Sequence, residues 1–439
     1  MRSTSCILVA LAVVVGSGCD GEMPPPPPRR DAGPGGDAGA LDAGPAIDGG
    51  GPSEDAGTGD GGPPPSDAGP AECVTSAAER HLLSTDPARG DRVVGFAAGG
   101  DAFGVIWAET REGQPDVFGR RVPTRGALGA EQRVTGQPSR ELPPSLAAFG
   151  TAWLAAWVDN DGSEGFEVRT QQLGADLAPT GTVHRLTATD TLREDNALIH
   201  VMGEGPFLLW TEDDMRAGTR TARARTLTAD GGARGTIQAV SEAGQRPAQI
   251  ALGELADGPV AIWTEGIGLE QDVLLQPLTR DGARRGAPVP ITAERNADGT
   301  VDAALRPTTG GAIVFGVLVE GVRREVRFRA MRADGTLVGS ETPLFAPPRR
   351  GSDASIAAFA GGYAVAFRGA DDGVEGSRVY LYFVDGVGNV LSELDLGPAS
   401  DAGGRVTVRA TGDGHLGVAW ADAETDGHAI RVQVIRCGG

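Results

Sequence analysis

The chain contains no lysine, so all 39 of its basic residues are arginine. This absence excludes P-loop, Schiff-base and serine–lysine chemistry, because each requires a lysine amine. Histidine is scarce as well: there are five residues, and no pair forms H-E-x-x-H. A G-x-S-x-G nucleophile elbow is also missing. The sequence therefore singles out no catalytic residue, metal ligand or cofactor, although a triad assembled from distant residues is left open.

Positive charge is in deficit. The chain carries 59 acidic residues against its 39 arginines, a formal net charge of −20. An acidic body repels phosphate backbones. We therefore expect no nucleic-acid partner.

Long apolar runs are few, and the longest opens the chain. Arg2 and the run from Ile7 to Val15 precede Gly16-Ser17-Gly18 and Cys19, which predicts a signal peptide over residues 1–18. The arrangement resembles a bacterial lipoprotein signal, although Gly16 stands where that family usually has leucine. The resemblance implies a lipidated Cys19 and a membrane anchor at the cell envelope, in a membrane that is not specified. Ordinary cleavage and secretion is the alternative.

Residues 19–72 lack large apolar side chains. The segment repeats Asp-Ala-Gly from Asp31 to Asp67 and contains the proline runs Pro24–Pro28 and Pro63–Pro65. It cannot bury enough surface to offset its conformational entropy, so we predict a disordered tether spanning roughly 40 Å. Such a tether suits a domain held off a membrane, and a neutral spacer is the alternative.

Aromatic residues make up only 5% of the chain, yet they recur at a constant interval. Short apolar runs end in one large aromatic residue every 50 to 53 positions, at Trp107, Trp157, Trp210, Trp263, Phe315, Phe367 and Trp420. We call these residues the anchors. Such a period with strand-like content predicts a radially repeated β architecture with the anchors in its core. Trp153 lies outside the repeat, and we expect it to fill space between repeats.

Each period contains four strand-like segments. The anchor run is continuously apolar, as in a strand buried on both faces, and an Asp-Gly or similar turn such as Arg280-Asp281-Gly282 joins the third and fourth segments. The fourth segment ends in a hydroxyl residue at Thr135, Thr187, Ser241 and Thr292. We predict an all-β fold over residues 73–439, a seven-bladed β-propeller with four-stranded antiparallel blades.

The seventh period lacks its fourth strand, and residues 81–85 match that pattern. An N-terminal strand would then complete the last blade and close the ring. With Cys6 in the leader and Cys19 lipidated, Cys73 and Cys437 remain, and both fall at the same end of that blade. We predict a disulfide between them.

The repeats resemble β-propellers of bacterial envelope lipoproteins over residues 73–439, without matching a functional class. The period is longer than that of WD repeats, and sialidase-type Asp-boxes are missing. Fold alone does not give function.

Two charged features recur. Acidic residues occupy the loops after the anchors, for example Asp159 to Glu164, which faintly resembles a calcium loop but is better explained as a solvated turn. The crossovers between periods each carry an arginine, at Arg92, Arg140, Arg193, Arg246, Arg295, Arg350 and Arg405. We expect most of these arginines to pair with loop acids. The sharper hypothesis is that some hold an anionic group at the mouth of the channel.

His200 and His415 fall in or beside strands, where a hydrogen-bonded core role is expected. We predict a monomeric binding or scaffold module at the cell envelope, with an unknown protein or glycan partner. One alternative is a glycan- or peptide-acting enzyme at the channel mouth. The other is a cation-stabilised structural propeller.

Overall fold

The computed structural model describes residues 73–84, 90–111, 114–136, 140–141, 144–160, 166–187, 192–214, 216–267, 270–293, 296–319, 323–359, 361–371, 374–399, 405–421 and 429–437. They belong to one compact unit, Gly62–Gly439. The predicted signal peptide, Cys19 and the tether up to residue 72 lie outside these residues.

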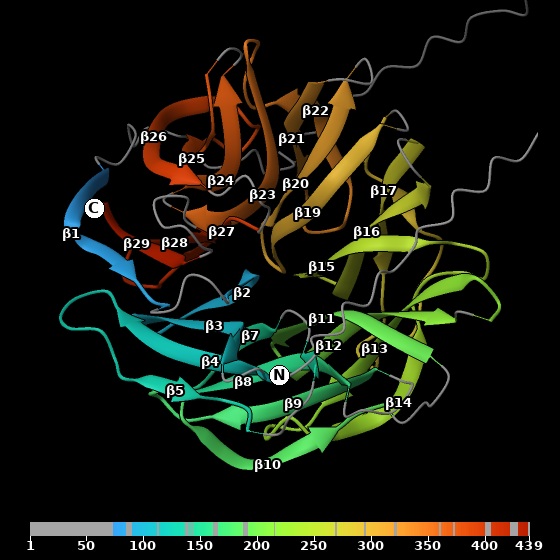
Figure 1. Ribbon diagram of the computed structural model, residues 1–439. Coiled ribbons are helices and arrows are strands. Elements are labelled where there is room, and N and C mark those ends of the chain that lie inside the picture. Colours follow the sequence, from blue (N-terminus) through green and yellow to red (C-terminus); the bar gives the residue numbers. More distant parts are fainter. Residues whose placement is uncertain are drawn as a thin grey trace, which may run out of the picture. The chain divides into compact units, whose positions relative to one another are not determined.

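Seven antiparallel four-stranded blades form a ring, which confirms the predicted all-β propeller (Figure 1). Gln271, in the third strand of the fourth blade, pairs with Ala297, in the innermost strand of the fifth blade, and this pair joins the two sheets. Blades one to three contain β2 (Gly90–Gly99), β3 (Ala102–Arg111), β4 (Gln114–Pro123) and β5 (Glu131–Arg133); β6 (Arg140–Glu141) with β7 (Ser145–Phe149), β8 (Ala152–Asn160), β9 (Glu167–Leu173) and β10 (Pro179–Arg185); and β11 (Leu192–Met202), β12 (Gly205–Asp214), β13 (Thr219–Leu227) and β14 (Ala233–Ala239).

The remaining blades repeat this order from the centre outward. They contain β15 (Pro247–Leu255), β16 (Gly258–Ile267), β17 (Glu270–Pro277) and β18 (Val289–Pro290); β19 (Ala297–Arg306), β20 (Gly310–Val319), β21 (Arg323–Met331) and β22 (Leu337–Pro343); β23 (Arg349–Phe359), β24 (Gly362–Asp371), β25 (Ser377–Val384) and β26 (Val390–Ala399); and β27 (Thr407–Ala410), β28 (His415–Ala421), β29 (Ile430–Cys437) and β1 (Cys73–Leu82).

The core is divided into seven apolar clusters, one between each pair of neighbouring blades. Each anchor belongs to the cluster that its blade shares with the preceding blade, as Trp210 does with the blade of Leu154. All seven anchors are at most 2% exposed, which confirms their predicted core role. Burial of one such side chain contributes about 2–3 kcal/mol.

Trp153 fills space between the first two blades, as expected. Its ring lies where a side chain on Gly99 or Gly104 of the first blade would begin: a Cβ there would approach the ring to within 2.8 and 2.9 Å. The indole is 4% exposed, and its Nε1 donates to the Ala175 carbonyl at 3.4 Å. Glycine at these two positions is therefore a packing requirement.

The hydroxyl residues that end the fourth strand have a repeated role. Each accepts a hydrogen bond of 2.8 to 3.1 Å from a buried backbone N–H of the third strand, so the outermost strand is fastened to its neighbour where the ladder ends. The four pairs are Thr135 with Val117, Thr187 with Val168, Ser241 with Ala222, and Thr292 with Val273.

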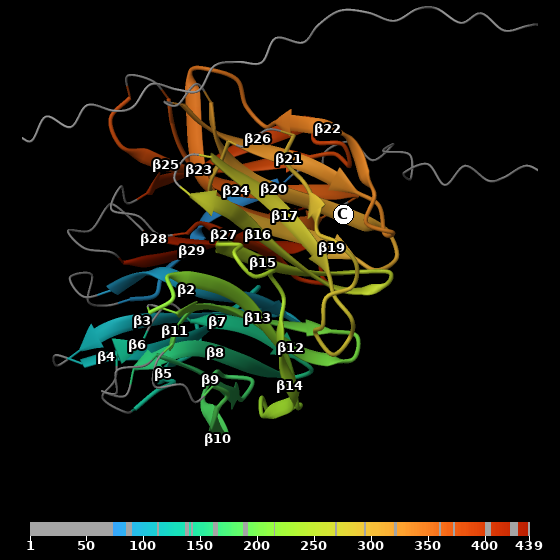
Figure 2. The ribbon, with the colours of Figure 1, turned by 90° about the vertical axis from the view of Figure 1, so that its right-hand side faces the viewer.

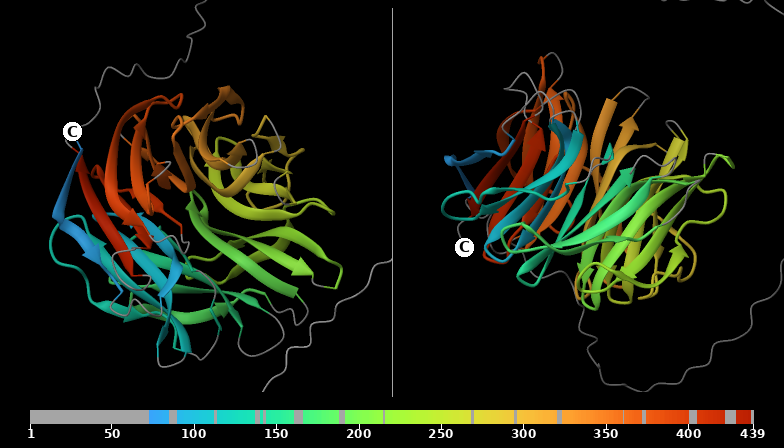
Figure 3. Two further views of the ribbon diagram at one scale, coloured as in Figure 1. Left: turned by 45° about the horizontal axis from the view of Figure 1, so that its top comes forward. Right: turned by 60° about the horizontal axis from the view of Figure 1, so that its bottom comes forward.

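The ring closes through its two ends. β1 pairs with β29 as the outermost strand of the seventh blade, which Figures 1 and 3 show as a blue strand beside a red one. The predicted residues do complete this blade: His81 and Leu82 pair with β29, and the Leu83 N–H donates to the Ile430 carbonyl at 2.9 Å. The strand extends further back than predicted, to Cys73. In Figure 2 the last blade lies directly against the first, and the two share an apolar cluster.

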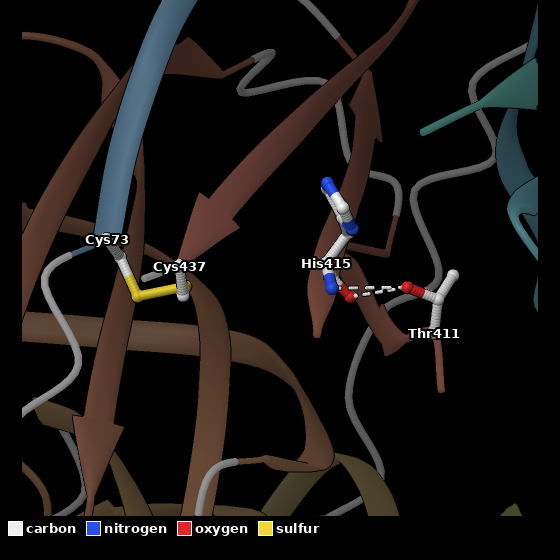
Figure 4. The surroundings of a disulfide bond; sticks show 4 residues. All are labelled: Cys73, Thr411, His415 and Cys437. Carbon is white, nitrogen blue, oxygen red and sulfur yellow. Dashed lines mark hydrogen bonds between the residues drawn. A yellow bond between two sulfur atoms is a disulfide. The ribbon is translucent and has the colours of Figure 1, made fainter. Parts of the chain in front are cut away.

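The predicted disulfide is confirmed. Cys73 and Cys437 are cross-strand partners in the β1–β29 register, and their sulfurs are 2.07 Å apart (Figure 4). The bond links residues 364 positions apart, so it joins the two ends of the propeller covalently.

Replacing both cysteines, as Cys73→Ser with Cys437→Ser, should lower the free energy of unfolding by about 2–4 kcal/mol, because the unfolded chain is no longer constrained by the loop. Denaturant titration measures the change, and reduced wild type is the matched control. Equal midpoints for oxidised and reduced protein, or two free thiols in the intact mass of the non-reduced protein, would contradict the prediction.

Candidate functional site

The innermost strands of the seven blades, β2, β7, β11, β15, β19, β23 and β27, line a central channel of about 610 Å³. Their register is the same around the ring, because one residue of each strand pairs with the residue just before the anchor. We call this the staple position; it is occupied by Gly95, Ser145, Leu198, Ala251, Asp302, Ser355 and Thr407.

Polar side chains at the staple position fasten neighbouring blades. Ser145 Oγ accepts from the Ile199 N–H at 3.1 Å and Asp302 Oδ2 from the Ile356 N–H at 3.2 Å. Ser355 Oγ does the same with Val408 at 3.2 Å. Each acceptor satisfies a backbone donor of the next blade.

Arg409 connects three blades inside the channel. Its Nη1 donates to Asp302 Oδ2 at 3.2 Å and to Ser355 Oγ at 3.1 Å, and it also reaches its own strand at the Val408 carbonyl. Ser355 Oγ donates in turn to Asp302 Oδ2 at 2.6 Å. The Asp302 carboxylate therefore neutralises Arg409, and this network is a structural brace.

A second ring of side chains lies two residues before the staple position. It consists of Asn196, Gln249, Thr300, Asp353 and Arg405, one from each of blades three to seven, and we call it the polar ring. Arg405 reaches across the channel from the seventh blade, and its Nη2 donates to Gln249 Oε1 of the fourth. Burial lowers the pKa of Arg405, against the opposing influence of Asp302 and Asp353.

The other members of the polar ring differ in their partners. Asp353 forms an ion pair with Arg368 at 2.5 Å. Thr300 is 6% exposed, and its Oγ1 is buried away from the channel with no hydrogen-bond partner among the described residues. Asn196 and Asp353 have left-handed backbones, with φ of 50° and 56°, at β-bulges in β11 and β23. A bulge redirects the side chain it carries, which suits these positions at the channel.

His200 lies two residues beyond the staple position of β11. Its ring is open to the channel but surrounded by the channel walls. Loss of hydration inside the channel lowers its pKa to about 4, and the Arg409 guanidinium acts in the same direction, while Asp302 opposes both. The imidazole is therefore neutral at pH 7. It is accessible to solvent in the channel, whereas the sequence predicted a hydrogen-bonded core residue.

His415 takes the expected core position. It is 3% exposed, and its backbone N–H and carbonyl bond to the Thr411 hydroxyl (Figure 4). Its Nδ1 lies 3.1 Å from an Asp413 carboxylate oxygen.

The predicted crossover arginines do not share one environment in the structure. Arg405 lines the channel, whereas Arg246 and Arg350 are exposed, and within the described ranges no carboxylate lies within ion-pair distance of these three. The expected pairing with loop acids is thus not found at these positions. The backbones of Arg92, Arg140 and Arg193 belong to β2, β6 and β11, and their side chains, like the whole of Arg295, lie outside the description.

Two of the predicted loop acids, Glu109 and Asp159, lie at the ends of the second strands β3 and β8 and pair with arginines of their own blades. Glu109, 1% exposed, accepts from Trp107 Nε1 and Arg111 Nε, each at 2.8 Å. Burial alone would raise the pKa of Glu109, but these hydrogen bonds outweigh it and hold the pKa below its usual value. Asp159 pairs in the same way with Arg169 at 2.9 Å. These acids therefore fasten blades internally.

The calcium-like segment falls largely beyond the description, since Asp161 to Glu164 are not among the described residues. Elsewhere in the described ranges, no group of three or more His, Cys, Asp or Glu residues is placed to hold a metal ion. The same residues include no helix long and apolar enough to cross a membrane.

Neither protein-family models nor curated proteins match the chain. Among solved structures it is similar to a puromycin-hydrolysing peptidase of Mycobacterium tuberculosis, at 15% identity and a TM-score of 0.51 over 80% of this chain and 54% of that one. The likeness thus spans about half of the peptidase. The lectin BP39L of Burkholderia pseudomallei is 16% identical, with a TM-score of 0.47 over 77% of this chain and 98% of the lectin. The polysaccharide lyase Uly1 is 12% identical, with a TM-score of 0.48 over 81% of this chain and 91% of the lyase. At these identities a shared fold is all that follows.

Sequence reasoning missed Gln249, Thr300, Asp302, Ser355 and Arg409. Aligning the periods on their anchors places Asn196, Gln249 and Asp353 in one column, but Thr300 and Arg405 join it only if a one-residue gap is allowed in the fifth and seventh periods. That alignment could not have shown which side chains meet across the channel.

His200 should make the protein sensitive to acid. Its folded pKa of about 4 is below the unfolded value near 6.5, so the unfolded chain binds more protons between these values and stability falls as the pH drops through this window. His200→Gln should reduce the difference in thermal midpoint between pH 7 and pH 4.5. The control is His184→Gln on the outermost strand β10, and an unchanged acid response in His200→Gln would contradict the prediction.

Proposed function

We propose that this protein is a binding module that takes an anionic group, a carboxylate or a phosphate, at the Arg405 end of its central channel. The observation that carries the proposal is the environment of Arg405. Its guanidinium lies inside the channel, where the residue is half-buried, and the one partner it has among the described residues is a neutral amide oxygen.

An enclosed cation without a carboxylate is costly, because its lost hydration is not compensated. Other partly buried arginines here avoid that cost: Arg111 bonds to Glu109 and Glu131, and Arg327 to Glu341 at 2.7 Å. An incoming anion would supply to Arg405 the charge that the chain supplies to the others.

A glycan- or peptide-acting enzyme receives less support from the same residues. Ser355 is engaged with Asp302 and Arg409, and the Asp302 and Asp353 carboxylates are each paired with an arginine. His200 has no recorded hydrogen bond to a nucleophile in the described part of the chain. Catalysis by acid and base needs such a contact within about 3 Å of the reacting group.

Arg405→Gln should weaken the binding of acetate and inorganic phosphate by about tenfold or more, since a hydrogen bond to a charged group is worth about 1.5–3 kcal/mol. Titration calorimetry on the folded variant measures the dissociation constants. Arg350→Gln removes an exposed crossover arginine and is the matched control. Equal binding by wild type and Arg405→Gln would contradict the proposal.

We further propose that this module is exported and held at the cell envelope by a lipid on Cys19. The leader, the small residues before Cys19 and the tether support the anchor. The Cys73–Cys437 disulfide supports an oxidising compartment.

Cys19→Ala should move the protein from the membrane fraction to the soluble exported fraction in the producing cell, because the lipid attachment atom is lost. Fractionation followed by intact-mass analysis measures both the location and the lipid. Cys6→Ala, within the leader, is the control. Membrane retention of the Cys19→Ala protein would contradict lipidation as the anchor.

A further inference from the structure

The polar ring narrows the class of ligand. Its five members present different chemistry at one level of the channel: two amides, one hydroxyl, one carboxylate and one guanidinium. Phosphate alone would use the guanidinium and bring its charges close to Asp353. A ligand that uses the whole ring needs one negative group and several groups that both donate and accept hydrogen bonds.

The two amides of the polar ring can bond to such groups. Gln249 Oε1 accepts a hydrogen bond from Arg405, which leaves the Nε2 amide group as a donor. No described residue is recorded as bonded to the Asn196 side chain, which the bulge in β11 places at the channel. An acyl chain beside these groups would leave them desolvated and unpaired, so a fatty acid is disfavoured.

We propose that the ligand is a polyhydroxylated monocarboxylate, a sugar acid such as a hexuronate. Its carboxylate bonds to Arg405, and its hydroxyls bond to Asn196 and Gln249. This inference rests on the proposed function, because it assigns the anionic group to Arg405.

The test uses the folded wild-type chain and four probes: D-galacturonate, D-galactose, acetate and hexanoate. D-galactose has the hydroxyls without the charge, acetate the charge without hydroxyls, and hexanoate the charge with an apolar body. Calorimetric titration should show D-galacturonate binding at least tenfold more tightly than each of the others.

The variant Asn196→Gly removes the side-chain amide and suits the left-handed backbone at this position. It should weaken D-galacturonate about fivefold, as expected for one hydrogen bond, and leave acetate unchanged. Asn389→Gly, at an exposed turn residue before β26, is the control for the same substitution outside the channel.

The outcomes separate this inference from the proposed function. Binding of acetate and D-galacturonate with equal affinity, both lost in Arg405→Gln, would overturn the sugar acid and leave the anion site standing. Tighter binding of hexanoate would overturn it in favour of an apolar acid. If none of the anions depends on Arg405, both proposals fall.

Discussion

Burial of the anchor strands on both faces is the constraint from which the rest of the structure follows. The second strand of each blade is apolar along most of its length, and its anchor is enclosed against the preceding blade. A blade with a neighbour on one side would expose the other face, so no blade is stable alone. The ring must therefore close. The pairing of β1 with β29 and the Cys73–Cys437 bond close the ring, because they join the first strand of the propeller to the last.

The same constraint explains why polar groups gather in the channel. Apolar side chains fill the space between the blades. The innermost strands, which line the channel, are where the repeat tolerates different side chains. There the staple position changes from Gly95 to Ser145, Asp302 and Ser355 without disturbing the interblade clusters. The side chains of Ser145, Asp302 and Ser355 each accept a hydrogen bond from a backbone N–H of the next blade. The channel thus serves as structure through Asp302 and Ser355, while the polar ring at Arg405 is left with unmet hydrogen-bonding capacity.

The exclusive use of arginine fits this division. A guanidinium can bond to two acceptors in fixed directions, and the blades use it in that way, as in Arg111 with Glu109 and Glu131. Loop acids that look like a negative surface in the sequence are in part internal partners of such arginines. The charge pattern that suggested a face with cations inside and carboxylates outside is therefore, for Glu109 and Asp159, a set of contacts within single blades.

The sequence by itself determined the number of blades, the identity of the anchors and the pairing of the two terminal cysteines, because these depend on a period that local burial enforces in every repeat. It placed the closing strand in the correct blade but identified only its C-terminal part, since the rest of β1, back to Cys73, is held by its ladder to β29 and does not follow the repeat pattern. It also listed seven equivalent arginines. Only the tertiary structure decided that Arg405 faces the channel while Arg246 and Arg350 face outward, and that Gln249 and Arg405, 156 residues apart, are partners. Contacts across the channel arise from ring closure, which brings together positions that no local pattern relates.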